Sequence, residues 1–282
     1  MKLNFKYSFF CFLLFFCEGF CQNTSNNSEL SINPIAKITS YNRSHFNADP
    51  QFWTMCEDKE GVSIFGNNDG VVFYDGNHWN KINLPNNSSV RSLLSTKEGV
   101  IYAGGYNEFG TLQKNEKGQY FYTSLIEQLH LNSRHIENIW QIHELNNSII
   151  CRTFNGLIVI TGKTALFIPS NESFLNAAVI DGVYYVQDAN HGIFSFDVKN
   201  KELNLIFQSN QFNNEEIASV VKSGDKDVLL VITKAGSVYK CNAKTFEIIK
   251  WVSLFDENQK DQVSCALKKD NQTILIGTLA SK

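Results

Sequence analysis

A glycine that recurs every 36 to 46 residues is the feature that most limits what this chain can fold into. It stands at Gly70, Gly110, Gly156, Gly192 and Gly236, with successive gaps of 40, 46, 36 and 44 residues. Each of these glycines ends a short turn and precedes a short run that contains β-branched or aromatic residues. A period of about 40–45 residues with four short strands per repeat is typical of a β-propeller. A helical repeat of similar length is disfavoured, because no repeat contains a long stretch with an apolar period of 3.6 residues.

The stretch Phe52–Pro85 shows the repeat in full. Its predicted strands are Phe52–Glu57, Val62–Gly66, Val71–Tyr74 and His78–Ile82. The turns between them consist mainly of Asp, Asn and Gly, which tolerate the left-handed backbone that hairpins need. One sheet of this size cannot bury both of its faces, so it needs copies of itself on either side.

The remaining repeats supply those copies. The predicted blades cover residues 52–85, 90–125, 136–169, 174–207, 217–252 and 263–282, and the last of them is incomplete. A propeller closes by pairing strands from the two ends of its chain, because an open ring leaves a sheet edge exposed. The prediction is therefore an all-β protein, a β-propeller of about five and a half blades out of an expected seven, and the front part of a longer protein.

The first 33 residues are predicted to lie outside the propeller. Residues 1–21 are typical of a secretory signal peptide, because a positive start is followed by an apolar run, Tyr7–Cys17, that is too short to span a bilayer. A membrane anchor is the disfavoured alternative. Residues 22–33 form a polar linker, and residues 34–282 the partial propeller. Export to the periplasm follows as an expectation.

Two further local elements are predicted. Asn33–Tyr41 alternates apolar and polar residues and is expected to form an isolated strand that completes the last blade of the full ring. Ser124–Glu127 has the pattern of a capping box, so a short helix is expected there and over the next two residues.

Charge and cysteine content exclude several functions. The chain carries a net charge of −3, and without residues 1–21 it carries −4. With no basic run, it offers no surface for nucleic acid. Four cysteines lie outside the signal peptide, and they permit two disulfides, although burial as small apolar side chains is favoured. The absence of CxxC spacing argues against a zinc or redox site. The four are Cys56, Cys151, Cys241 and Cys265.

Motifs of known chemistry are missing from the sequence. It contains no phosphate-binding loop, HExxH, GxSxG or EF-hand loop. The prediction is a protein that is not an enzyme and that has no cofactor and no metal site.

The turns between second and third strands share one face of a propeller, and this face is the predicted ligand site. Amides, carboxylates and aromatic rings together suit a small polar ligand such as an oligosaccharide, although each residue alone is equally well explained as a turn former. Tyr106, Glu108 and Phe109 are the predicted ligand-binding residues. The whole set is Asn67, Asn68, Asp69, Tyr106, Asn107, Glu108, Phe109, Asn155, Asp188, Asn190 and His191.

Residues 41–112 resemble the N-terminal propeller of bacterial two-component-regulator-propeller sensors. The matching pieces are NADPQFW, EDKEG, GNNDGVVFYDGNHW, LPNNSSVRS and GGYNEFG. The later blades match more loosely. The resemblance implies a periplasmic propeller followed by a three-tyrosine β-sandwich, one membrane helix, and either a histidine kinase or a LuxR-type helix-turn-helix. The LuxR-type branch is the more similar one.

The leading hypothesis is thus a non-enzymatic sensor ectodomain that contacts the membrane only through C-terminal parts beyond this chain. A homodimer of the longer protein stays open, as do the ligand and the output domain. The alternatives are an exported binding or scaffold propeller, a truncated remnant, and a propeller hydrolase or lyase. Expressed alone, the chain is expected to be aggregation-prone, because residues 274–276 would form an uncovered apolar edge.

Overall fold

The computed structural model describes residues 38–131, 135–256 and 261–279. The chain from Tyr41 onward forms one compact unit, and the strands and sheets described below all belong to it. The predicted signal peptide, residues 1–21, and the predicted linker, residues 22–33, lie outside the described residues. Within the described residues, no helix is long and apolar enough to cross a membrane.

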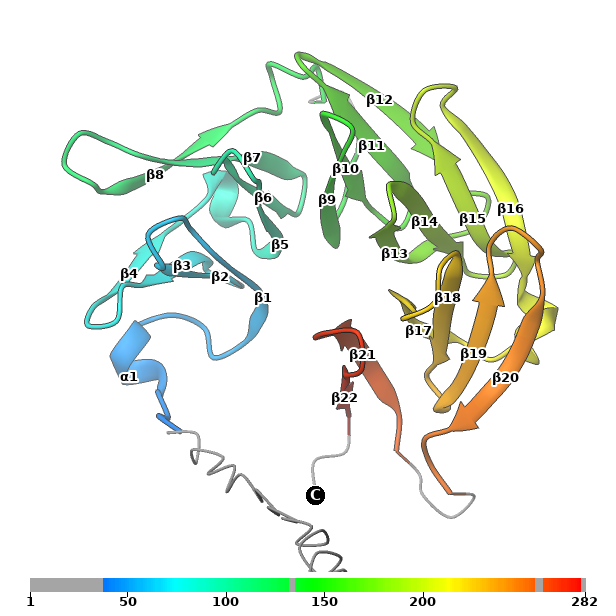
Figure 1. Ribbon diagram of the computed structural model, residues 1–282. Coiled ribbons are helices and arrows are strands. Elements are labelled where there is room, and N and C mark those ends of the chain that lie inside the picture. Colours follow the sequence, from blue (N-terminus) through cyan, green and yellow to red (C-terminus); the bar gives the residue numbers. More distant parts are fainter. Residues whose placement is uncertain (1–37, 132–134, 257–260, 280–282) are drawn as a thin grey trace, which may run out of the picture. The chain divides into compact units, whose positions relative to one another are not determined.

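Five four-stranded antiparallel sheets follow one another along the chain, and a two-stranded sheet comes last (Figure 1). We number the four-stranded sheets as blades 1 to 5. Blade 1 consists of β1 (Phe52–Glu57), β2 (Ser63–Asn67), β3 (Gly70–Tyr74) and β4 (Trp79–Ile82). Blade 2 consists of β5 (Val90–Ser95), β6 (Ile101–Gly105), β7 (Glu108–Lys114) and β8 (Tyr120–Ser124). Blade 3 consists of β9 (Gln141–Leu145), β10 (Ser148–Arg152), β11 (Gly156–Thr161) and β12 (Thr164–Pro169).

The later blades repeat this order. Blade 4 consists of β13 (Phe174–Ile180), β14 (Val183–Asp188), β15 (Gly192–Asp197) and β16 (Glu202–Gln208). Blade 5 consists of β17 (Ile217–Lys222), β18 (Val228–Thr233), β19 (Ser237–Asn242) and β20 (Ile248–Ser253). The last sheet consists of β21 (Val263–Lys268) and β22 (Ile274–Thr278). The prediction of an all-β β-propeller with four-stranded blades is confirmed.

The first strand of each blade lies innermost. β1 is next to β5, β5 to β9, β9 to β13, β13 to β17, and β17 to β21. Figure 1 shows the fourth strands, from β4 to β20, on the outer rim. The first strands therefore line the centre, and the turns between second and third strands share one face.

Four of the five recurring glycines mark a close approach of two backbones; at the fifth, Gly236, a Cβ atom would meet the ring of Phe255 instead. A Cβ atom at Gly70 would lie 2.3 Å from the carbonyl oxygen of Ile82, and one at Gly192 would lie 2.0 Å from that of Phe207. Gly110 and Gly156 meet the fourth strand in the same way, at 2.1 and 2.3 Å. The period in the sequence thus records a contact between the third and fourth strands that only glycine permits.

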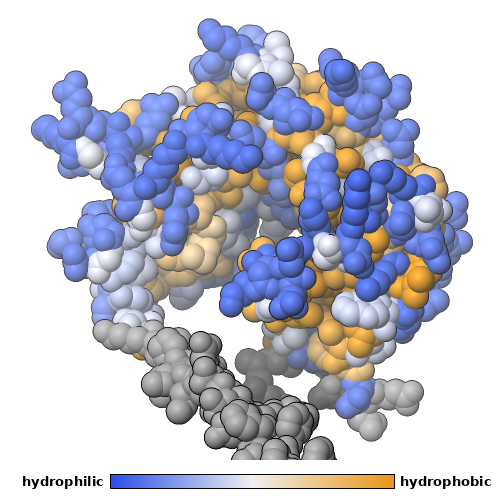
Figure 2. Space-filling model, viewed as in Figure 1, coloured by the Kyte–Doolittle hydropathy of each residue, from blue (hydrophilic) through white to orange (hydrophobic). Residues whose placement is uncertain are grey.

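The core lies between neighbouring blades. Ile64 and Phe73 of blade 1 pack with Leu93 of blade 2, and the same kind of apolar cluster joins each later pair. Figure 2 shows hydrophobic residues in the spaces between blades and hydrophilic residues over the exposed turns. Each large side chain buried in this way contributes about 1.5–3 kcal/mol, so a blade is stable only beside its neighbours.

Some local predictions are wrong. Residues 38–41 form no strand, and the rest of the strand predicted over Asn33–Tyr41 lies outside the described residues. Residues 126–130 form a turn rather than a helix, since the hydrogen bond from Leu129 N to Leu125 O is not continued along the chain. The sequence analysis also missed α1 (Arg43–Phe46), whose first turn is capped by the side chain of Asn42.

The four described cysteines are free. Cys151 in β10 and Cys241 in β19 are buried, as expected for small apolar side chains. Cys265 in β21 is exposed. Leu275 and Ile276 of β22 are also exposed, which agrees with the uncovered apolar edge expected at residues 274–276.

Candidate ligand site

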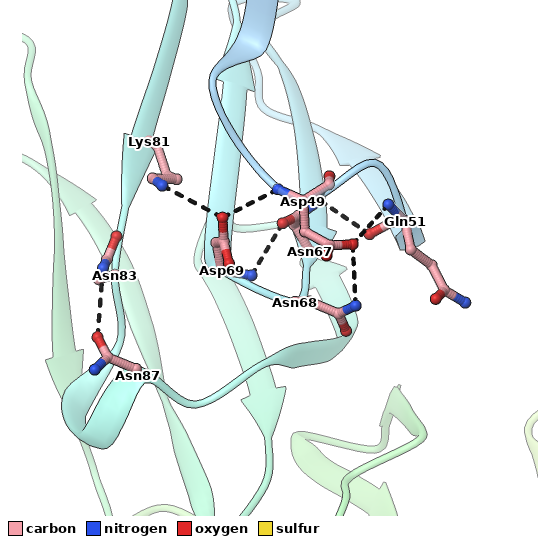
Figure 3. A network of polar contacts seen from close by, with 8 residues as sticks. All are labelled: Asp49, Gln51, Asn67, Asn68, Asp69, Lys81, Asn83 and Asn87. Carbon is pink, nitrogen blue, oxygen red and sulfur yellow. Dashed lines mark hydrogen bonds and ion pairs between the residues drawn. The ribbon is translucent and has the colours of Figure 1, made fainter. Parts of the chain in front are cut away.

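Two polar residues of the β2–β3 turn, Asn67 and Asp69, hold the fold together through hydrogen bonds. Asn67 is completely buried, and its Nδ2 donates hydrogen bonds to the carbonyl oxygens of Asp49 and Gln51 at 2.7 and 2.9 Å (Figure 3). Asp69 accepts from Asp49 N at 3.0 Å and from Lys81 Nζ at 3.5 Å. These bonds hold the segment that enters β1 against the turn.

Asp188 has a similar role in blade 4. Its carboxylate is fully buried and accepts from the backbone N–H of Glu172 at 3.1 Å. Its other oxygen lies 2.7 Å from Nδ1 of His191, which is exposed. The remaining predicted turn residues, Asn155 and Asn190, are exposed, with no side-chain hydrogen bond to another described residue.

The three predicted ligand residues have very different surroundings. Tyr106 is 49% exposed, whereas Glu108 is 5% exposed and Phe109 is fully buried. Glu108 Oε1 accepts from Tyr122 Oη at 2.9 Å and from Ser124 Oγ at 2.6 Å. Phe109 packs in the core between blades 2 and 3. A ligand on this face meets only the Tyr106 side chain of the three, and a ligand-binding role for any of them stays a prediction.

A hollow of about 450 Å³ opens on this face beside Tyr106. Its walls come from the β2–β3 turn, from the connection between blades 1 and 2, and from the β6–β7 turn. We call it the amide hollow, because four of its lining residues are asparagines. The lining residues are Asn68, Asn86, Asn87, Ser88, Ser89, Tyr106 and Asn107.

The connection between blades 1 and 2 is the wall that sequence reasoning missed. Asn86 and Asn87 in the short 3-10 helix η1 (Pro85–Asn87) both have positive φ, 57° and 52°, which Asn tolerates better than most residues. Ser88 Oγ accepts from Tyr106 N at 2.9 Å and donates to Tyr106 O at 3.0 Å. The run NNSS at residues 86–89 is the feature of the sequence that could have indicated this wall. The sequence analysis uses it only as part of a motif that resembles sensor propellers.

The opposite wall is fixed in the same manner. Asn107 has a φ of 50°, and its backbone N–H and side-chain Oδ1 pair with the backbone of Glu137 at 2.8 and 2.9 Å. The ring of His135 stands edge-on to that of Tyr106 at 5.9 Å. Hydrogen bonds therefore fix the backbone segments that form the hollow. Its lining presents amide and hydroxyl groups and one aromatic ring, and it contains no charged side chain.

This lining suits a neutral, hydroxyl-rich ligand. Amide groups offer both donors and acceptors to sugar hydroxyls, and an exposed tyrosine ring offers an apolar surface to a sugar face. Among the described residues, no group of three or more His, Cys, Asp or Glu side chains could hold a metal ion.

Two larger cavities are lined differently. One of about 1110 Å³ lies between blades 3 and 4, where Val159, Leu166 and Phe196 line the space between diverging outer strands. Another of about 670 Å³ lies along the inner strands of blades 3 to 5 and the last sheet, between the side chains of Gln141, Ala178 and Ala266. Both contain charged side chains in their linings, such as Asp197 in the first and Arg152 in the second, whereas the lining of the amide hollow has none.

No protein-family model matches the chain, and no curated protein matches its sequence. Solved structures do share its fold. The extracellular domain of the putative one-component system BT4673 from B. thetaiotaomicron superposes with a TM-score of 0.61 at 15% identity over 80% of this chain. A second structure of that domain, described as part of a putative hybrid two-component system, gives 0.60 at 16% identity. This chain spans about 30% of the length of both.

An enzyme also has this fold. Catalytically inactive virginiamycin B lyase from Staphylococcus aureus, solved with quinupristin, superposes with a TM-score of 0.60 at 12% identity, over 80% of this chain and 77% of the lyase. At these identities the likeness establishes the propeller fold alone. The propeller fold expected from the resemblance of residues 41–112 is thus shared by an extracellular domain of a putative one-component or hybrid two-component system, while nothing here bears on the LuxR-type branch.

Proposed function

We propose that this chain is the propeller of an exported sensor, and that it binds a neutral oligosaccharide in the amide hollow. The observation that carries the proposal is the exposed ring of Tyr106 beside four asparagines in an uncharged hollow of about 450 Å³. Binding here would bridge blades 1 and 2, because the lining comes from both. The chain itself is assigned no catalysis.

The location and the signalling role rest on two supports. The apolar run in residues 1–21 favours export, and the extracellular domains of a putative one-component or hybrid two-component system share the propeller fold. In this proposal the longer protein is anchored in the inner membrane, and the output domain lies beyond Lys282. A LuxR-type output is the expectation from the motifs of residues 41–112.

The ligand claim is tested by titrating the chain with a panel of neutral oligosaccharides. We expect saturable binding of at least one of them. Tyr106→Ala should lose about five- to thirtyfold in affinity, since stacking on an aromatic ring contributes about 1–2 kcal/mol. Phe121→Ala is the matched control, because Phe121 is an exposed aromatic residue on β8 of the same blade, far from the hollow lining. Equal affinities for wild type and Tyr106→Ala would remove the site.

Reading the gene beyond the codon for Lys282 separates a sensor from an exported scaffold. The proposal expects further blade strands, a β-sandwich and an apolar helix of about 20 residues, followed by an output domain. A stop codon directly after Lys282 would favour the scaffold or remnant alternatives and would withdraw the signalling role. Turnover of the bound oligosaccharide by the purified chain would contradict the assignment as a non-enzyme.

A further inference from the structure

Three large side chains occupy the same place on three successive inner strands. β1 has a bulge between Phe52 and Thr54, so Trp53 has no paired residue on β2. In the same way, β5 has a bulge between Val90 and Ser92, so Arg91 has no paired residue on β6. In blade 3 the equivalent residue is Trp140, which directly precedes β9 and donates from its backbone N–H to Arg152 O at 2.9 Å. Bulges re-aim side chains and are frequent beside functional sites.

In the other sheets, the residue at this position has a small or aliphatic side chain. The bulges of β13, β17 and β21 fall at Leu175, Ala218 and Ser264. The large side chains are therefore confined to the arc of blades 1 to 3. Figure 2 shows the molecule hollowed at the centre, where the inner strands face one another.

The three side chains touch. The Cζ atom of Arg91 lies 3.8 Å from the ring centroid of Trp53 and 5.7 Å from that of Trp140. The two indole rings are 6.2 Å apart and nearly perpendicular, at 80°. Phe154 extends the aromatic surface, with its ring centroid 5.2 Å from that of Trp140. We call Trp53, Arg91 and Trp140 the indole–arginine cluster.

Two residues of the cluster, Arg91 and Trp140, have buried polar atoms without partners. Among the described residues, Arg91 makes no ion pair, and its Nε and Nη1 are buried without a hydrogen bond. The Nε1 donor of Trp140 and the nearby Oδ1 of Asn138 are buried and unpaired as well. Arg152, on the neighbouring β10, differs, because it donates to Gln141 Oε1 at 2.7 Å and to Phe174 O at 2.6 Å. Buried donors without partners are costly, so the cluster is poised for an acceptor.

We infer that the indole–arginine cluster binds a ring compound that carries a carboxylate. The carboxylate would accept hydrogen bonds from the Arg91 guanidinium, whose planar fork matches a carboxylate in geometry and charge. The ring would pack on the exposed parts of Trp53 and Phe154, which are 38% and 36% exposed. The Arg91 guanidinium has no ion pair among the described residues, and this local positive charge favours an anion over a neutral sugar. The cluster shares no side chain with the lining of the amide hollow, so the two claims can fail separately.

The test compares acids with their neutral counterparts. D-galacturonate and benzoate are titrated against D-galactose and benzamide, with quenching of tryptophan fluorescence as the readout. We expect saturable quenching by at least one acid at millimolar concentration, and affinity at least about tenfold weaker for its neutral partner, because hydrogen bonds between charged groups are the strong ones. Inorganic sulfate, which has charge but no ring, is expected to bind more weakly than that acid.

Variants assign the effect to the cluster. Arg91→Gln is expected to lose at least about tenfold in affinity for the acid, while Arg43→Gln, an exposed arginine on α1, keeps it. Tyr106→Ala, which tests the amide hollow, should leave binding of the acid unchanged. If Arg91→Gln no longer melts cooperatively, Arg91→Lys decides, because it keeps the charge but not the fork.

The overturning results are equally definite. The inference is wrong if neither acid binds, if the acids and the neutral compounds bind alike, or if Arg91→Gln binds the acid as wild type does. Unchanged affinity in Arg91→Lys would overturn recognition by the guanidinium fork, and equal binding of sulfate would overturn the part given to the indole rings.

Discussion

Trp53 Nε1 donates a hydrogen bond to Asn68 Oδ1 at 2.8 Å, which ties the innermost strand of blade 1 to the wall of the amide hollow. Asn68 in turn donates to Asp49 Oδ1 at 3.0 Å (Figure 3). The indole of Trp53 thus has two neighbours of different character, with the Arg91 guanidinium on its face and an asparagine of the hollow at its N–H. The two proposed sites are adjacent through this one side chain.

Asn67→Ala is expected to destabilise the chain by about 1–3 kcal/mol, because it removes a buried side chain whose Nδ2 donates two hydrogen bonds, to the carbonyl oxygens of Asp49 and Gln51. The free energy of unfolding in denaturant measures this. Asn77→Ala is the matched control, since Asn77 is exposed and should change stability by no more than about 0.5 kcal/mol. Equal effects of the two substitutions would show that Asn67 is only a turn former.

Glu108 should behave as a structural acceptor. Glu108→Ala removes the acceptor of Tyr122 Oη and Ser124 Oγ and is expected to cost about 2–3 kcal/mol in unfolding free energy. Glu108→Gln keeps a carbonyl oxygen in the same place and should cost about 1 kcal/mol. If both variants were as stable as wild type, the buried contacts of Glu108 would contribute nothing, and a role in ligand binding would become the better explanation of this carboxylate.

Asp58 should make the chain less stable in acid. Burial raises the pKa of Asp58, but hydrogen bonds from Lys114, Tyr120 and two backbone N–H groups outweigh it and set the pKa to about 2. The folded carboxyl therefore stays ionised where the unfolded one, with a pKa near 3.9, takes up a proton. The ionised Asp58 carboxylate stabilises the folded chain by an amount on the order of 2 kcal/mol. This stabilisation is complete above about pH 4 and is lost as the pH falls to about 2.

Asp58→Asn tests this assignment. The variant should be less stable than wild type at neutral pH, and its unfolding free energy should fall less between pH 4 and pH 2. Glu116→Gln, at an exposed turn residue, is the control and should keep the slope of the wild type. The same slope in Asp58→Asn as in wild type would place the acid sensitivity elsewhere.

His143 should add a second pH dependence, at higher pH. Burial lowers the pKa of His143, and the charge of Arg152 lowers it further, to about 4. Below about pH 6.5 the unfolded chain binds a proton at this histidine that the folded chain does not. The free energy of unfolding therefore falls between about pH 6.5 and pH 4, by about 3 kcal/mol. Unfolding at pH 7, 5.5 and 4 should show this in wild type and in His78→Gln, whose histidine is exposed, but not in His143→Gln.

The blades were predictable because their cause is local and repeated. In blades 1 to 4 the third strand comes so close to a carbonyl oxygen of the fourth strand that there is no room for a side chain. Glycine therefore recurs once in each of these blades, at Gly70, Gly110, Gly156 and Gly192. The strands between them follow from short apolar runs and turn residues. Sequence reasoning could therefore recover the fold class.

The site was only partly predictable, because burial depends on segments far apart in the chain. Asn67 and Asn68 are neighbours of the same type, yet residues 49–51 cover the first and leave the second at the hollow. Glu108 was predicted to bind a ligand, but its side chain is buried, and its partners lie 14 and 16 residues further on, across the blade. The indole–arginine cluster joins three blades through bulges, and no local pattern reveals that contact.

Hydrogen–deuterium exchange with and without a neutral oligosaccharide tests the central claim most directly. If the ligand lies in the amide hollow, backbone amides of residues 86–89 and 104–109 should exchange more slowly in its presence, while those of blades 4 and 5 should not change. Protection confined to the cavity between blades 3 and 4, or no protection anywhere under saturating ligand, would contradict the account.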